Sequence, residues 1–150
     1  MSRAAATLVE IATEEASAQT ALRDSQEREE LALAWGQGAT GRGMATGGSK
    51  ALKELEKEQK SRATRLIRDC IDSALIDLAT LYRDLMMAQV GVNDNFINHD
   101  LAPQIMSFAQ QQKSEKTLQK IDAIMKSRVN LSFNAAPLLT IEALMCTLAQ

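Results

Sequence analysis

Residues 66–88 read LIRDCIDSALIDLATLYRDLMMA, and this stretch predicts the helix around which the rest of the chain is organised. Its apolar residues recur at steps of three and four, which places them on one face of an α-helix at about 100° per residue. No Gly or Pro interrupts the pattern. The predicted core face consists of Leu66, Ile67, Cys70, Ile71, Ala74, Leu75, Leu78, Leu81, Tyr82, Leu85 and Met86.

A second, thinner apolar line runs down the opposite side of the same helix. It consists of Ile76, Met87 and Val90, with Thr80 and Arg83 between them. A helix with two apolar lines usually has two neighbours. We therefore expect this line to contact either a partner protein or the short C-terminal helices of the same chain. Its candidate interface residues are Ile76, Thr80, Arg83 and Met87.

The composition favours helix along nearly the whole chain. The 150 residues have about the length of one domain. Ala, Leu, Glu, Gln, Lys and Arg dominate, whereas β-branched and aromatic residues are scarce. We therefore expect an all-α protein that forms a single helical domain over residues 1–150.

Charge and hydropathy limit the partners that the chain can attract. The formal net charge of −2 creates no global field that would gather nucleic acid or an anionic membrane. The N-terminus lacks a signal-peptide pattern, and no run approaches the roughly 18 apolar residues of a membrane span. We expect a cytoplasmic protein without a membrane partner.

The N-terminal part predicts a long antiparallel hairpin. Residues 1–35 carry a narrow apolar stripe and an excess of acids, whereas residues 50–70 carry an excess of bases. These opposite charges suit the pairing of two helices. We expect this hairpin, closed by a glycine-rich loop over residues 36–49, to project and to continue into a compact bundle of about five helices over residues 66–150.

The glycine-rich loop contains two patterns that resemble nucleotide-binding motifs. Residues 36–41, GQGATG, fit the dinucleotide fingerprint GxGxxG. Residues 43–50, GMATGGSK, resemble a phosphate-binding loop with its last two residues exchanged. Both motifs require a preceding β-strand and a helix N-terminus aimed at the phosphate, but a polar helix precedes them here. We therefore predict a glycine linker without a cofactor.

Three shorter helices are predicted after the sequence VGVNDN, which breaks the central helix with Gly91 as its C-terminal cap. We expect Asp100 to cap the first of them and Ser114 to cap the second. In the second helix, four apolar residues are expected to face inward. They are Leu118, Ile121, Met125 and Val129.

The last helix is expected to begin near Pro137 and is almost entirely apolar, with Glu142 as its only charge. Such a helix usually lies in the centre of a bundle or in an interface. Leu139 and Met145 are therefore further candidate interface residues.

No arrangement of residues in the sequence points to an enzyme. Cys70 and Cys146 have neither the number nor the spacing of a zinc site or a disulfide framework, and we expect both to be reduced and buried. The single histidine, His99, is expected to have a local structural role. Because no nucleophile–base pair or paired carboxylates appear at usable spacing, we predict no catalytic, cofactor-binding or metal-binding residues.

The basic residues of the predicted hairpin suggest an alternative function. Lys53, Lys57, Lys60 and Arg65 are candidates for contact with phosphates, although acids are interleaved among them and aromatic residues are absent. The alternative is an autonomous helical module that binds nucleic acid or protein through residues 50–68.

Three segments together resemble a known protein family. They are residues 55–65, LEKEQKSRATR, residues 77–84, DLATLYRD, and residues 134–144, NAAPLLTIEAL. They resemble the C-terminal part of the bacterial DNA polymerase III delta-prime subunit in its actinobacterial form. The similarity covers most of the chain, and LEKEQKSRATR is its most specific segment.

This resemblance implies a part in the clamp loader, a five-subunit ATP-driven machine that opens the sliding clamp and places it on primed DNA. In that family the C-terminal helical domain is the collar, which holds the subunits in a ring and performs no chemistry. The implied partners are subunits of the gamma/tau and delta types, with primer–template DNA and the sliding clamp contacted only indirectly. The family's N-terminal AAA+ module has no counterpart in these 150 residues, so no ATP-binding residue is carried over.

Overall fold

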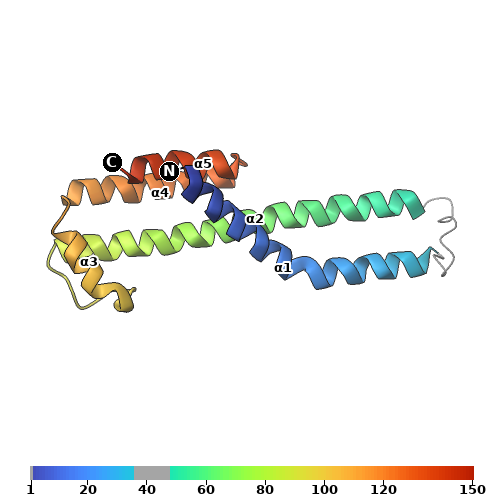
Figure 1. The fold of residues 1–150 in the computed structure, drawn as a ribbon, viewed down its shortest axis with the longest axis horizontal. Coiled ribbons are helices and arrows are strands. Elements are labelled where there is room, and N and C mark those ends of the chain that lie inside the picture. The colour runs from blue at the N-terminus through green and yellow to red at the C-terminus, as the bar shows by residue number, and fades with distance from the viewer. Residues whose placement is uncertain (1, 36–47) are drawn as a thin grey trace. The chain divides into compact units, whose positions relative to one another are not determined.

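The computed structural model describes residues 2–35 and 48–150, and α-helix dominates these ranges (Figure 1). No β-strand occurs within them, so the predicted all-α fold is confirmed. The elements are α1 (Ser2–Ala34), α2 (Gly48–Gln89), the short 3-10 helix η1 (His99–Leu101), α3 (Ala102–Ala109), α4 (Ser114–Ser132) and α5 (Pro137–Leu148).

Helix α2 contains both the charged residues 50–65 and the apolar stretch of residues 66–88 in one uninterrupted helix. It begins at Gly48, so Gly48 and Ser49 belong to the helix and not to the loop expected over residues 36–49. The remainder of that loop lies outside the described residues, together with GxGxxG and most of the sequence that resembles a phosphate-binding loop.

The chain divides into two compact units. The hairpin unit is Glu10–Cys70, and the bundle unit is Met1–Val9 together with Ile71–Gln150. In the hairpin unit, α1 and the first half of α2 run antiparallel beside each other (Figure 1). The bundle unit contains the start of α1, the second half of α2, and η1 to α5.

Two helices end in the same backbone motif. After α2, Gly91 has a φ of 82°, and the N–H of Val92 donates to the carbonyl oxygen of Met87 at 2.9 Å. After α4, Asn134 has a φ of 63°, and the next N–H donates to the carbonyl oxygen of Asn130 at 3.1 Å. Glycine and asparagine tolerate this left-handed conformation best. The predicted cap at Gly91 is confirmed.

The two predicted N-terminal caps are wrong. Asp100 lies inside η1, and α3 begins after Leu101 without a side-chain cap. Helix α4 is preceded by Lys113, and its first residue, Ser114, makes no capping hydrogen bond. The first backbone hydrogen bonds are accepted by the carbonyl oxygens of Asn98, which precedes η1, and Lys113, which precedes α4. The local preference of Asp and Ser for the cap position therefore does not decide where these helices start. The predicted start of α5 at Pro137 is confirmed.

The core of the bundle unit is built from α2, α4 and α5. Ile71 and Leu75 of α2, Ile124 of α4, and Ile141 of α5 are almost completely buried. Asp72 of α2 joins α4 by accepting two hydrogen bonds from the Arg128 guanidinium, at 2.7 and 2.9 Å. The Arg128 guanidinium holds the pKa of this carboxyl below its ordinary range, although burial acts in the opposite direction.

The predicted core face of α2 is only partly enclosed. Leu85 is buried in a separate small cluster with Phe96 and Ile105. Leu78, Leu81 and Tyr82 are half-buried, so the expectation that this whole face forms the core is too broad. The uncovered part of the face borders a groove between α2, α3 and α4.

Candidate functional site

A buried carboxylate, which the sequence analysis did not single out, fastens the loop after α2 to the helix itself. Asp84 has no exposed side-chain surface. Its Oδ2 accepts hydrogen bonds from the backbone N–H of Ile97 at 2.9 Å and from the backbone N–H of Asn98 at 2.8 Å. The side-chain amide of Asn98 donates to the same oxygen at 2.8 Å, and Arg83 donates to Oδ1 at 2.8 Å.

These hydrogen bonds determine the charge state of Asp84. Burial alone would raise the pKa of this carboxyl, but the donors from Asn98, Ile97 and Arg83 outweigh burial and hold the pKa below its ordinary range. Asp84 is therefore an ionised structural anchor.

The second line of α2 lies beside this anchored loop. Thr80 accepts a long hydrogen bond from the Asn98 side chain at 3.4 Å, and Arg83 donates to the carbonyl oxygen of Asn95 at 3.2 Å. Met87 packs against the cluster around Phe96. These contacts place Thr80, Arg83 and Met87 next to the loop of their own chain.

The two ends of the second line remain open. Ile76 is 41% exposed and Val90 is 63% exposed, although both are large apolar residues. They are therefore the apolar members of the line that are most accessible to a partner.

Helix α4 turns a different face toward the core than the one predicted. Leu118, Met125 and Val129, which were expected to face inward, are exposed, and Ile121 is half-buried. The residues that are buried instead are Thr117, Ile124, Ser127 and Leu131.

Local hydrogen bonds allow the polar residues of this inward face to be buried. The hydroxyl group of Ser127 donates to the carbonyl oxygen of Ala123 at 2.9 Å, and Thr117 accepts a hydrogen bond from Gln112 at 3.0 Å. Because these hydroxyl groups are satisfied, their burial costs little. The apolar stripe of α4 is thus left on the outer surface.

The two candidate residues of α5 occupy different environments. Leu139 is 67% exposed, whereas Met145 is half-buried. The opposite face of α5 contributes Ile141 and Leu144 to the core and packs against α4. Cys146 is exposed, so the prediction that it is buried is wrong.

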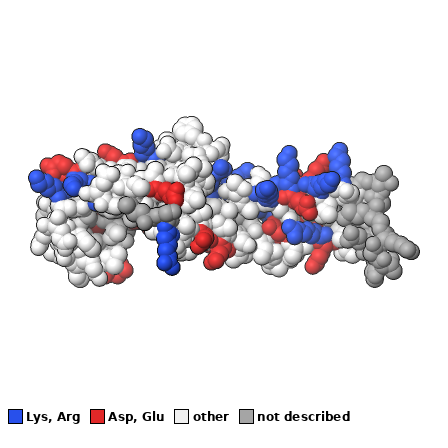
Figure 2. Space-filling model, turned by 45° about the horizontal axis from the view of Figure 1, so that its top comes forward, with Lys and Arg blue, Asp and Glu red and all other residues white. Residues whose placement is uncertain are grey.

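The four candidate basic residues of the hairpin unit are all exposed. Lys53, Lys57 and Lys60 follow one another at steps of four and three and therefore share a face of α2. Arg65, five residues after Lys60, points to another side. On the face drawn in Figure 2, acidic side chains are mixed with the basic ones, so the surface is not uniformly basic.

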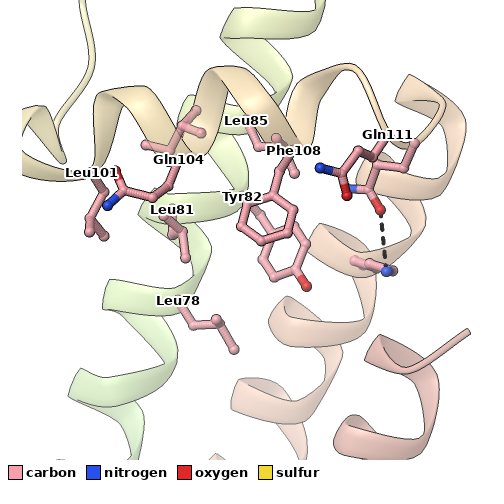
Figure 3. A pocket seen from close by; sticks show the side chains of 11 residues that line it. Leu78, Leu81, Tyr82, Leu85, Leu101, Gln104, Phe108 and Gln111 are labelled. Carbon is pink, nitrogen blue, oxygen red and sulfur yellow. Dashed lines mark hydrogen bonds between the residues drawn. The ribbon is translucent and has the colours of Figure 1, made fainter.

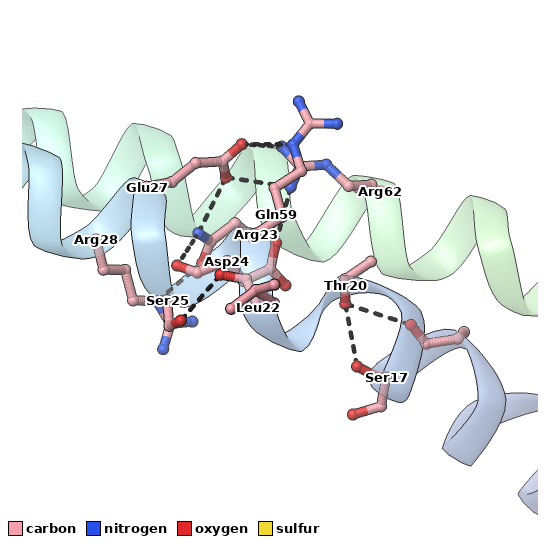
Figure 4. A network of polar contacts seen from close by, with 11 residues as sticks. Ser17, Thr20, Leu22, Arg23, Asp24, Ser25, Glu27, Arg28, Gln59 and Arg62 are labelled. Atoms are coloured by element: carbon pink, nitrogen blue, oxygen red, sulfur yellow. Dashed lines mark hydrogen bonds and ion pairs between the residues drawn. The ribbon is translucent and has the colours of Figure 1, made fainter.

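A polar network holds the two arms of the hairpin unit together (Figure 4). Gln59 of α2 is buried, donates to the backbone carbonyl oxygen of Asp24 at 3.0 Å, and accepts a hydrogen bond from Arg28 at 2.9 Å. Arg62 binds the carboxylates of Asp24 at 2.8 Å and Glu27 at 2.9 Å. Because these contacts all join α1 to α2, the network sets the register of the hairpin.

Glu27 is the titratable residue of this network. Hydrogen bonds from Arg62 and then from Arg23 lower the pKa of Glu27 from 4.5 to about 2. The folded-state pKa lies below the unfolded value, so the stabilisation is complete above about pH 4.5 and is lost as the pH falls toward 2.

We expect Glu27→Gln to loosen the hairpin. At neutral pH, amide protons of α1 near residue 27 should exchange faster with solvent than in the wild type. Between pH 4.5 and 2, the wild type should lose protection that the variant lacks from the start. Hydrogen exchange read by mass spectrometry provides the measurement. The control is Glu29→Gln, at an exposed position of the same helix, and an equal effect of both variants would contradict the assignment.

The bundle unit contains a largely apolar groove of about 580 Å³ between α2, α3 and α4 (Figure 3). Leu78, Leu81 and Tyr82 project into it from α2, and Phe108 borders it from α3. Lys120 of α4 supplies the one charged side chain among its described lining residues. Periodicity alone could not reveal this groove, because it assigned the same leucines to a closed core.

Neither a metal cluster nor a membrane-spanning helix is found in the described ranges. No group of three or more His, Cys, Asp or Glu side chains in residues 2–35 and 48–150 is placed to hold a metal ion. Within the same ranges, no helix combines the length and the apolar character needed to cross a membrane.

Comparison with known proteins identifies one family. The model of the family described as DNA polymerase III, delta subunit, C terminal, matches residues 49–145, which extend from the start of α2 through most of α5. No curated protein and no solved structure matches the chain. The matched family is a non-catalytic domain of the clamp loader. Because the match covers well over half of its residues, the chain belongs to the family formed by the C-terminal domains of DNA polymerase III delta subunits.

Proposed function

We propose that this chain is the collar domain of a delta-prime type of clamp-loader subunit, in its actinobacterial form. The family match over residues 49–145, which is to delta subunits, supports the clamp-loader assembly role, and the delta-prime type rests on the resemblance of individual segments. The segments LEKEQKSRATR in α2 and NAAPLLTIEAL at the start of α5, which resemble the delta-prime subunit, lie inside that range. The domain would support loading of the sliding clamp in DNA replication, and therefore act in the cytoplasm, by holding subunits together and not by catalysis.

The proposed partners are clamp-loader subunits of the gamma/tau and delta types. Two exposed apolar sites support such an assembly, Leu139 on α5 and Ile76 on α2. Covering such side chains with an apolar partner surface would gain free energy. Thr80, Arg83, Met87 and Met145 would complete the contact around these two positions. Primer–template DNA and the sliding clamp would be reached only through the assembled ring.

We expect Leu139→Asp and Ile76→Asp to prevent assembly without unfolding the chain. Both side chains are exposed, so a charge there costs little in the monomer, whereas it would be desolvated in an interface. The chain is mixed with purified gamma/tau and delta subunits, and the mass of the complex is measured by light scattering. Circular dichroism checks the fold of each variant.

Leu33→Asp is the matched control, because Leu33 is an equally apolar and exposed residue of the hairpin unit. It should leave assembly unchanged. Wild-type assembly by both Leu139→Asp and Ile76→Asp would contradict the proposed interface, and failure of the wild-type chain to join any such complex would contradict the proposed function.

The alternative function is nucleic-acid binding, which the exposed line of Lys53, Lys57 and Lys60 favours. If these three residues contacted phosphates of double-stranded DNA, the logarithm of the affinity would fall with the logarithm of salt concentration with a slope of about −2.7. The triple replacement by alanine would remove that slope. A salt titration with primer–template DNA therefore separates the alternative from the assembly function.

A further inference from the structure

The groove between α2, α3 and α4 leaves the most regular apolar face of the chain half uncovered. Leu78, Leu81 and Tyr82 belong to the predicted core face but are only half-buried, and Phe108 at the rim is 57% exposed. The volume of about 580 Å³ lies within the usual range of ligand pockets, roughly 300–1,000 Å³. Apolar surface of this kind gains free energy when another apolar group covers it.

The end of the groove next to α4 is polar and carries a positive charge. Gln111 and Gln112 line this end together with Lys120, whereas Gln104 lies beside Leu101 and Leu81 (Figure 3). Gln112 is held in place because its backbone carbonyl oxygen accepts a hydrogen bond from Gln89 at 2.9 Å and its side-chain amide donates to Thr117 at 3.0 Å. The groove therefore has a polar end held by hydrogen bonds, next to a cation.

Lys120 is half-buried, and its ammonium group donates to the neutral side-chain oxygen of Gln112 at 3.3 Å. No Asp or Glu is among the described residues that line the groove. A partly desolvated ammonium group without a carboxylate is complementary to an anion. Apolar surface beside such a cation is the pattern that an acidic amphipathic segment matches.

We propose that this groove binds a short amphipathic helix of a partner protein, with two large apolar side chains against Leu81 and Phe108 and a Glu or Asp side chain at Lys120. A helix fits because apolar residues at steps of three and four lie on one face, and an acid one turn further reaches the polar end. The glutamine side chains at that end can both donate to and accept hydrogen bonds from the partner.

The test begins with a displayed library of random 12-residue peptides that is selected against the full chain. The expected enriched peptides combine at least two large apolar residues with an acid about one turn away. The most enriched peptide is then synthesised, and its affinity is measured by isothermal titration calorimetry. We expect Phe108→Ala and Lys120→Glu each to weaken binding by at least about tenfold.

A charge exchange provides the decisive control. Replacing the acid of the peptide by lysine should restore binding to Lys120→Glu while weakening binding to the wild type. Lys126→Glu, at an exposed position of α4 outside the lining of the groove, should change the affinity less than about twofold. Circular dichroism confirms that each variant is folded.

Several outcomes would overturn the proposal. They are the absence of any enriched peptide, enrichment without acids, equal effects of Lys120→Glu and Lys126→Glu, and failure of the charge exchange. Dodecanoate is tested in parallel by NMR, and binding of this fatty acid at Tyr82 without binding of any peptide would show a different occupant. The test contains no other clamp-loader protein, so its result is independent of the assembly experiment.

Discussion

Replacement of Asp84 by alanine is expected to lower the free energy of unfolding of the bundle unit by about 3–5 kcal/mol. The carboxylate is completely buried and accepts four hydrogen bonds, three of them from Ile97 and Asn98. Without it, two backbone N–H groups would lose their acceptor, and the loop after α2 would lose its attachment. Hydrogen exchange can localise the loss to the amides of residues 92–98.

A second variant separates charge from hydrogen bonding at this position. Asp84→Asn keeps one acceptor oxygen of similar shape, so its cost should be smaller, about 1–2 kcal/mol. Asp77→Ala is the control, because Asp77 lies two turns earlier on nearly the same face of α2 but is exposed. Equal losses for Asp84→Ala and Asp77→Ala would show that the buried carboxylate is not an anchor.

The stability of the bundle unit should also depend on pH through Asp84. Its pKa in the folded chain is depressed, so its contribution is complete above the unfolded value, about 3.9, and is lost as the pH falls through the folded value. The wild type should therefore lose stability below about pH 4. Asp84→Asn should show a weaker dependence over the same range, because the titrating group is absent.

Replacement of Ile141 by alanine is expected to cost about 2–5 kcal/mol, because the lost side chain leaves a cavity in the core. Ile141 has no exposed surface and lies on the face of α5 that packs against α4. Such a loss is a large part of a total stability of about 5–15 kcal/mol. Chemical denaturation provides the measurement, with hydrogen exchange to assign the loss to the bundle unit.

The control for Ile141 lies two residues away on the same helix. Leu139→Ala removes a similar side chain that is 67% exposed, so the expected cost is below about 0.5 kcal/mol. The free-energy cost of Leu78→Ala should lie between the costs of these two variants, because Leu78 is half-buried at the groove. If Leu139→Ala were as costly as Ile141→Ala, the assignment of inner and outer faces of α5 would be wrong.

The helices themselves follow from local sequence. The helix-favouring composition and the regular apolar spacing predict α2 except for its first two residues, Gly91 marks its end, and Pro137 marks the start of α5. These features depend on residues within one or two turns of each other, which is the distance over which periodicity and helix-ending preferences act.

Only the tertiary structure determined which faces are covered. Periodicity finds an apolar stripe on α4 at Leu118, Met125 and Val129, yet packing buries the face of Ile124 and leaves that stripe outside. The spacing of residues along one helix does not state which side another helix will occupy. Pairing of Asp84 with Asn98, and of Gln59 with Arg28, likewise joins residues separated in the chain. Such buried polar contacts depend on geometry that arises only when the helices pack, because a polar side chain is stably buried only where its partners meet it.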